Sequence, residues 1–417
     1  MMELTRKFLL LNILFIIITC ILTGCWDRVE LEELLIVVGL AFDCSEEADS
    51  IIITQQYVNP KGIGGGEKGG TTQKSPYANI IVKGCNVSDV LEKSKNMEGR
   101  RPNYEHLKLI IISEDAARAF NMYKLLNAIL RHPETPRNTN ILISEGKARS
   151  FFEITPNTED VPVFKMLMIS SNSKFKSRIP PTLKLGDISK SMAGGKSFTV
   201  QRLVMRDGIE SPLDTMVTDT APGKGDIYEI NGAAVIRGDT YTLAGWLNEK
   251  ETNGLNWITG KTESGVVEIK DKGTGQIIVY EAHKVKSKII PIVSRDGKVP
   301  GNNIVPQEDI SFTVECKIDG TIIEDWLMTA NAFEEGFIEK VELSVQKEVF
   351  CIVEETLNKV QKELKTDIAG FGKQLNIKYP KVWEKVKDNW EEIFSDIPVN
   401  IKVETYVRDY GRQGSKK

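Results

Sequence analysis

A cysteine stands at the end of the most apolar segment of this chain. Residues 8–22 are almost wholly apolar, and the stretch from Leu22 to Cys25 reads Leu-Thr-Gly-Cys. This spacing is typical of the lipobox of bacterial lipoproteins, in which the cysteine sulfur receives a diacylglyceryl group and the bond between Gly24 and Cys25 is cleaved. Small residues at positions 23 and 24 let the extended backbone enter the peptidase, and the thiol carries the lipid as a thioether. We therefore predict that residues 1–24 are a lipoprotein signal peptide and that Cys25 is lipidated.

An uncleaved membrane anchor is the alternative. A spanning helix needs about 20 apolar residues, whereas the apolar region of a signal peptide is shorter. An anchor would also predict further apolar residues or a basic cluster after Cys25, but acidic residues follow at positions 27, 30, 32 and 33. Two acyl chains hold a protein stably on a bilayer, where one chain holds it only marginally. A diacylated Cys25 would therefore be enough to tether the chain.

No other residues show the spacing of a catalytic or metal site. The histidines and the remaining cysteines are scattered, with no C-x-x-C and no H-E-x-x-H pattern. In the predicted mature chain they are His106, His132, His283, Cys44, Cys85, Cys316 and Cys351, because Cys20 lies in the signal peptide. The Gly-rich segment 59–76 lacks the G-K-[ST] ending of a phosphate loop. We expect no catalytic residue, no metal and no cofactor. A bridge between Cys44 and Cys85 is conceivable because both end predicted strands, but buried free thiols are favoured.

The charge balance argues against a nucleic-acid partner. The chain has 54 basic and 58 acidic residues, which gives a formal net charge of −4, and a nucleic-acid binder would show a basic excess. Removal of the predicted signal peptide leaves 417 − 24 = 393 residues. That length predicts two or three domains.

The first half alternates strands with helices. Five segments rich in β-branched residues read as buried strands: 34–43, 50–58, 78–84, 106–113 and 139–144. A helix is predicted from Val87, with Asn86 as its N-cap, and another from Ser113 to Leu130. We therefore predict an α/β domain over residues 25–178, followed by a less regular small middle domain or linker over residues 179–225.

The second half reads as strands, then helices, then a last strand. Two strands at 228–247 are joined at Arg237-Gly238-Asp239-Thr240, which we interpret as a hairpin turn with positive φ at Gly-Asp rather than as an adhesion motif. A long helix is predicted over 334–368, a second helix over 380–394, and a strand after Pro398 that joins the sheet. Gly370 and Gly372 follow the long helix, where a left-handed C-terminal residue is usually Gly. These elements make an α+β domain over residues 226–411, with a tail at 412–417.

Tryptophans raise the question of partner contact. Trp383 and Trp390 lie on one stripe of the predicted second helix, where core packing is the favoured interpretation. Trp246 and Trp257 are the candidates for contact with a partner, because aromatic residues are enriched in interface cores. Burial of both indoles in the core is an equally good alternative.

Three stretches resemble one protein family. The sequence G-C-W-D and its acidic, apolar continuation resemble the start of mature Ger(x)C proteins, the C subunits of nutrient germinant receptors in endospore-forming bacteria. Residues 230–261 resemble the hairpin, the G-W-L and the E-T-x-G-x-x-W run of that family. Residues 367–411 resemble its ending, with D-x-x-G-F-G, Y-P-x-x-W and W-x-x-x-F. The chain departs from the family where the usual Arg-Glu pair is spread as Arg28-Val29-Glu30, and where Ile236 replaces a common Phe.

The resemblance implies a fold and a role. It implies an α+β lipoprotein of three domains in an elongated body, with mixed sheets flanked by helices, attached to the outer face of the spore's inner membrane. It also implies assembly with two integral-membrane subunits, of A and B type, into a receptor for small nutrients, without a catalytic site. The alternative is the solute-binding lipoprotein of an ABC importer, which would show two doubly wound lobes and a cleft.

Overall fold

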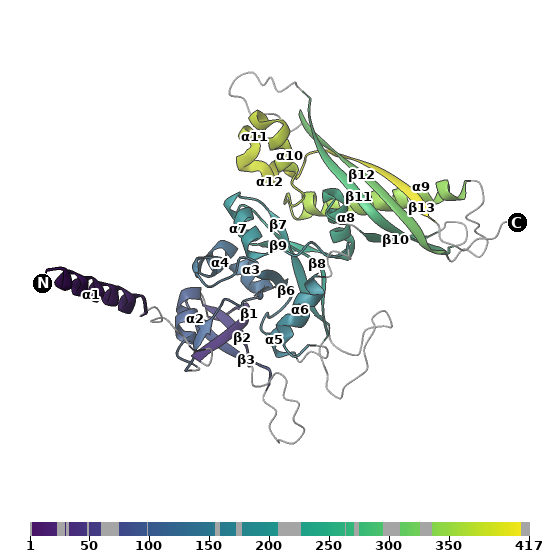
Figure 1. The fold of residues 1–417 in the computed structure, drawn as a ribbon. Coiled ribbons are helices and arrows are strands. Elements are labelled where there is room, and N and C mark those ends of the chain that lie inside the picture. Colours follow the sequence, from purple (N-terminus) through teal and green to yellow (C-terminus); the bar gives the residue numbers. More distant parts are fainter. Residues whose placement is uncertain are drawn as a thin grey trace.

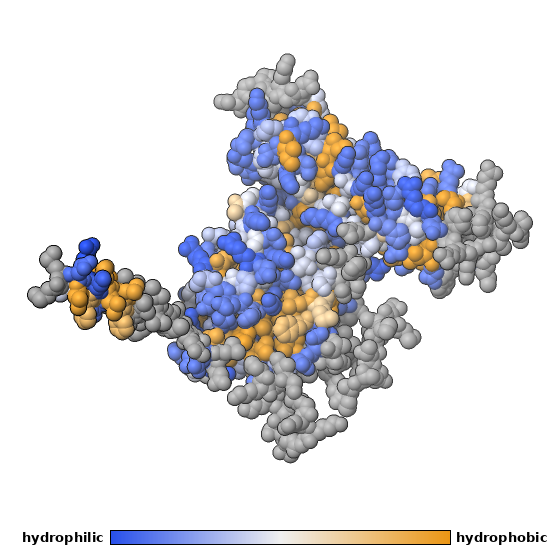
Figure 2. Space-filling model, viewed as in Figure 1, coloured by the Kyte–Doolittle hydropathy of each residue, from blue (hydrophilic) through white to orange (hydrophobic). Residues whose placement is uncertain are grey.

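The computed structural model describes most of the chain. The described residues are 2–22, 30, 33–47, 50–59, 75–97, 99–154, 159–171, 177–206, 227–262, 264–270, 275–294, 309–325 and 336–409. Gly24 and Cys25 lie outside them. Residues Met2–Leu22 form helix α1, and its apolar side chains are prominent in Figure 2. Within the described residues, no helix has both the length and the hydropathy needed to cross a bilayer.

A large mixed sheet organises the first part of the chain (Figure 1). Its strands are β1 (Leu34–Cys44), β2 (Ile51–Val58), β3 (Tyr77–Gly84), β4 (Arg101–Asn103), β5 (Leu109–Ser113), β6 (Asn140–Ser144), β7 (Phe198–Arg206), β8 (Ile227–Ile236) and β9 (Leu243–Leu247). Their order is β3-β2-β1-β5-β6-β7-β8-β9, with β4 beside β1. The four central strands from β1 to β7 run parallel, and antiparallel strands extend the sheet on both sides. The five strands predicted for the first half are all present.

Helices cover both faces of this sheet. One face carries α2 (Val87–Ser94), α3 (Glu114–Ala119), α4 (Met122–Arg131) and α7 (Leu185–Ala193), and the other carries α5 (Ser150–Glu153) and α6 (Pro162–Ser171). Alternate residues of a strand point to opposite faces. Accordingly, Ile110 and Ile112 of β5 pack into the first core, and Leu109 and Ile111 pack into the second. A strand that is buried on both faces is apolar along its whole length. This explains the uninterrupted apolar sequence from which β5 could be predicted.

A second sheet forms the rest of the molecule. Its order is β10 (Gly265–Lys270), β11 (Ile277–Val293), β12 (Ile310–Asp325) and β13 (Val399–Asp409). The packed helices are α8 (Glu249–Thr259), α9 (Phe337–Asn358), α10 (Phe371–Lys378), α11 (Pro380–Val386) and α12 (Trp390–Phe394). The first three strands are antiparallel, and β13 pairs parallel with β12. The prediction that the last strand joins the sheet is therefore confirmed, as is the α+β class with mixed sheets.

Several predicted boundaries differ from the observed ones. Strand β7 lies within the large sheet, and β8 and β9 continue that sheet, so the sheet crosses the predicted boundary at residue 225. The predicted small middle domain therefore has no sheet of its own, and the division into independently folding units at 178, 225 and 411 stays a prediction. The long helix ends with a π-helical turn at Lys359–Glu363, and a 3₁₀ turn at Lys387–Asn389 separates α11 from α12. The helix predicted after Ser113 is interrupted between α3 and α4.

The Arg-Gly-Asp sequence forms the turn between β8 and β9, where Ile236 pairs with Leu243. The prediction of positive φ at Gly-Asp is wrong, because the positive φ falls on Tyr241, at 54°. Glycine is required at position 238 for another reason. A Cβ on Gly238 would lie 2.5 Å from the carbonyl oxygen of Gly195, so the turn packs directly on the backbone before β7.

Four described cysteines, Cys44, Cys85, Cys316 and Cys351, are free thiols in the structure. Cys44 and Gly84 pair with Ile51 from opposite sides, so strand β2 separates them. Two strand spacings amount to about 9–10 Å, and a disulfide needs Cα atoms within about 7 Å. The conceivable Cys44–Cys85 bridge is therefore excluded in this fold. Cys316 is buried as expected, but Cys85 is exposed, contrary to the expectation of buried thiols.

Candidate functional site

A cavity of about 680 Å³ lies between the two sheets. Its walls come from the loop before β7, the end of α8, the middle of β11, and the segment that carries α10 to α12. Both halves of the molecule therefore contribute to one concave surface. The residues that hold these walls together form the candidate site.

Asp367 fixes the wall formed by α10. Its carboxylate accepts hydrogen bonds from the backbone N–H groups of Gly370 (2.8 Å), Phe371 (2.9 Å) and Gly372 (2.7 Å), and from the indole N–H of Trp390 (2.9 Å). The first N–H groups of a helix have no partner within the helix, and this carboxylate supplies one. Burial raises the pKa of Asp367, and the four donors oppose that rise.

Glycine is needed at two positions of the same motif, for a different structural reason at each. Gly370 has φ of +88° and precedes α10, a backbone region that glycine adopts without steric cost. Gly372 packs against two indole rings, because a Cβ there would lie 2.7 Å from Cζ3 of Trp383 and 2.7 Å from Nε1 of Trp390. Only a residue without a side chain lets both rings approach the backbone this closely.

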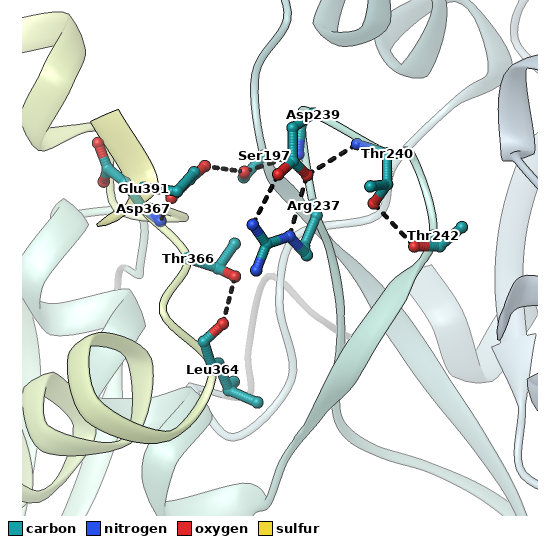
Figure 3. Close-up of polar contacts among 10 residues, drawn as sticks. Ser197, Arg237, Asp239, Thr240, Thr242, Leu364, Thr366, Asp367 and Glu391 are labelled. Atoms are coloured by element: carbon teal, nitrogen blue, oxygen red, sulfur yellow. Dashed lines mark hydrogen bonds and ion pairs between the residues drawn. The ribbon is translucent and has the colours of Figure 1, made fainter. Parts of the chain in front are cut away.

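Glu391 connects this motif to the large sheet (Figure 3). One carboxylate oxygen accepts the hydroxyl proton of Ser197 (2.6 Å), and the other accepts the backbone N–H of Asp367 (2.6 Å). The Ser197 hydroxyl in turn accepts the backbone N–H of Gly238 (2.9 Å). A chain of three hydrogen bonds therefore runs from the β8–β9 turn, through the start of β7, to the C-terminal helices.

The charges around these three hydrogen bonds are partly balanced. The guanidinium of Arg237 donates to both carboxylate oxygens of Asp239 (2.9 and 2.6 Å) and also acts electrostatically on Glu391. Desolvation by burial raises the pKa of Glu391, and the hydroxyl of Ser197 opposes that rise. Hydrogen bonds to a carboxylate are stronger than neutral ones. The network therefore positions the two halves relative to each other.

The arrangement connects the two halves of the molecule through hydrogen bonds. All four carboxylate oxygens of Asp367 and Glu391 already accept protein donors. In the part of the chain that the structure describes, no three His, Cys, Asp or Glu side chains converge as a metal site would require.

The predicted site residues lie elsewhere. Trp257 is fully buried in the core of the second sheet, which is the alternative the sequence left open for it. Trp246 is half-buried; its indole N–H donates to Glu114 (3.2 Å), and the guanidinium of Arg202 lies 5.1 Å from its ring centroid. Gly24 and Cys25 are outside the described residues. Trp383 and Trp390 pack in the core, as favoured from the sequence.

Local sequence patterns indicate only part of the network. Asp367, Gly370 and Gly372 form the D-x-x-G-F-G pattern, and its glycines follow the predicted long helix, where a left-handed residue is usually Gly. Ser197 and Glu391 are 391 − 197 = 194 residues apart, and no local pattern predicts that they meet.

Comparisons with known proteins cover nearly the whole chain. Residues 27–219 match the model of the spore germination protein N-terminal domain, and residues 231–411 match that of the spore germination B3/GerAC-like C-terminal domain. Spore germination protein YndF of Bacillus subtilis (strain 168) is 30% identical, with 98% of each chain covered. Spore germination protein A3 of the same organism is 28% identical over 96% of this chain and 98% of the relative.

A solved structure has a similar fold. The crystal structure of the GerBC protein matches with a TM-score of 0.57 and 25% identity, over 89% of this chain and 97% of that chain. These relatives are germination proteins, and nothing in the comparisons supports the importer alternative. The full-length similarity, both domain matches and the shared fold agree with the motifs read from the sequence, and the chain belongs to the Ger(x)C family of spore germination proteins.

Proposed function

We propose that this chain is the non-catalytic, lipid-anchored C subunit of a nutrient germinant receptor, and that it acts in receptor assembly and signalling. The observation that carries the proposal is the similarity over nearly the full length to spore germination proteins YndF, A3 and B3. The carboxylates of Asp367 and Glu391 support a structural role, because each of their oxygens accepts a hydrogen bond that joins elements of the protein.

Membrane attachment would occur through Cys25 at the outer face of the spore's inner membrane. The Leu-Thr-Gly-Cys sequence supports this attachment, and two acyl chains give stable anchoring. Mass spectrometry of the mature protein is expected to find a diacylglyceryl group on Cys25 at the N-terminus. Cys25→Ala should leave the precursor uncleaved or release the protein from the membrane, and Cys85→Ala, which changes an exposed thiol, is the matched control. An intact Met1 terminus on the wild-type protein in spore membranes would refute the anchor.

The partners would be two integral-membrane subunits of A and B type. Deletion of this chain should abolish germination in the nutrients that its receptor serves, and re-expression of the wild type should restore it. Normal germination of the deletion strain in every nutrient tested would remove the receptor role. Trp246 is the remaining candidate for partner contact, because part of its indole is accessible.

A further inference from the structure

The cavity between the two sheets has an excess of positive charge. Four lysines line it, and they come from different segments: Lys196 before β7, Lys261 after α8, Lys288 on β11 and Lys373 on α10. Among the described residues, none of the four side chains forms an ion pair or a hydrogen bond. The two acidic residues of the cavity, Asp367 and Glu391, are instead occupied by the N–H and O–H donors described above.

The positive charge of one of these lysines acts unfavourably on another. Burial and, second, the positive charge of Lys373 lower the pKa of Lys261. An ammonium group that is partly desolvated beside a like charge is unfavourable unless an anion compensates it. No acidic side chain is among the groups that act on Lys261. Lys261 keeps contact with solvent in the free protein, and an anion bound between the two lysines would compensate both charges.

The remaining lining fits a small organic molecule. Trp383, Trp390, Ile258 and Ile289 supply apolar wall between the lysines. A volume of about 680 Å³ lies within the range of small-molecule sites, roughly 300–1,000 Å³.

We propose that this cavity binds a small oxyanion, a carboxylate or a phosphate, with Lys261 and Lys373 as its principal ligands. An anion held by Lys261 and Lys373, whose elements pack on the second sheet, contacts both halves of the molecule when it also reaches Lys196, which precedes β7 of the large sheet. A ligand that contacts both halves stabilises their present arrangement by its binding free energy. The inference rests on the cavity and holds independently of the receptor role.

The test measures thermal unfolding of the purified full-length protein in detergent. Sodium phosphate and sodium citrate are the two probes, compared with sodium chloride at equal ionic strength. A ligand that binds only the folded state raises the melting temperature as its concentration exceeds the dissociation constant. We expect at least one probe to raise the melting temperature with saturation, and the identity of that probe separates phosphate from carboxylate recognition.

Substitutions assign the effect to the cavity. Lys261→Met and Lys373→Met should each remove most of the shift, whereas Lys286→Met, an exposed lysine of β11 that does not line the cavity, should retain it. In chloride alone, Lys261→Met should melt at or above the wild-type temperature because a repulsion is removed, so a lost response is not a sign of misfolding. No saturable shift in the wild type, or an equal shift in Lys261→Met, would overturn the proposal.

Discussion

The substitution Gly372→Ala tests the packing of the C-terminal motif most directly. An added Cβ would lie 2.7 Å from Cζ3 of Trp383 and 2.7 Å from Nε1 of Trp390. Carbon atoms in favourable contact are about 3.5–4.0 Å apart, so the rings must move by roughly 1 Å. The Trp390 indole also donates to Asp367 at 2.9 Å, and its displacement weakens that hydrogen bond.

The expected cost follows from these two effects. Overpacking of a well-packed core costs about 1–3 kcal/mol, and partial loss of a hydrogen bond to a charged acceptor adds about 1 kcal/mol. We therefore expect Gly372→Ala to lower the free energy of unfolding by about 2–4 kcal/mol. For a cooperative unit of 150–250 residues, this lowers the melting temperature by roughly 5–15 °C.

Two further alanine variants separate steric cost from backbone cost. Gly336 has φ of +83° and a Cβ there would meet no atom within 4 Å, so Gly336→Ala measures the backbone cost alone, about 1 kcal/mol. Gly370, at +88°, is almost as open and should cost about the same or slightly more. Circular dichroism followed during heating, with urea unfolding of each variant, gives the comparison. A Gly372→Ala protein that melts with the wild type, or no lower than Gly336→Ala, would refute the packing argument.

The remaining predictions concern a carboxyl group, two indoles and a thiol. Glu391 has a pKa held above 4.5 by burial, so its protonated form favours the folded state, and its contribution to stability is present at low pH and lost as the pH rises through the raised value. Unfolding of wild type and Glu391→Gln across pH 4–8 should therefore show the wild type losing stability relative to the variant, and parallel curves would contradict this. Trp257→Ala should cost about 3–5 kcal/mol because the indole is fully buried. Trp246→Ala should melt close to the wild type but lose co-purification of membrane subunits from spores; a large drop in its melting temperature would mean that the residue is core. A thiol reagent should label Cys85 first in the folded protein, and a reducing agent should leave the melting temperature unchanged because the four cysteines that the structure describes in the two sheets and their helices are all free.

The strands of the first half could be predicted because their signal is local. A strand such as β5, buried on both faces, shows an uninterrupted apolar run, and Asn86 and Ser113 cap their helices as expected. Sheet membership was harder to predict, because β7 and β8 join the large sheet through pairings that no local pattern specifies. A boundary placed at residue 225 followed a change in composition and not a change in hydrogen bonding.

The contacts between the two sheets could not be predicted from the sequence for a different reason. Gly370 was expected to end the long helix in a left-handed conformation, but it precedes the following helix instead, and the long helix ends in a π-helical turn at Lys359–Glu363. The D-x-x-G-F-G pattern therefore indicates that glycine is needed at position 370, but it does not indicate the structural reason. The contact between Ser197 and Glu391 depends on how the two sheets pack, so it follows from tertiary structure alone.

The parallel pairing of β13 with β12 affects how the protein folds during its synthesis. Phe312 pairs with Val399, so 399 − 312 = 87 residues separate the partners. At about 5–20 residues per second, a ribosome needs roughly 4–17 s to synthesise that interval. The large sheet is complete at residue 247, but β12 keeps an open edge, prone to pairing with other chains, until the last strand is available. A nonsense codon before residue 399 would therefore yield an aggregation-prone product that quality control removes, and not a shorter working subunit.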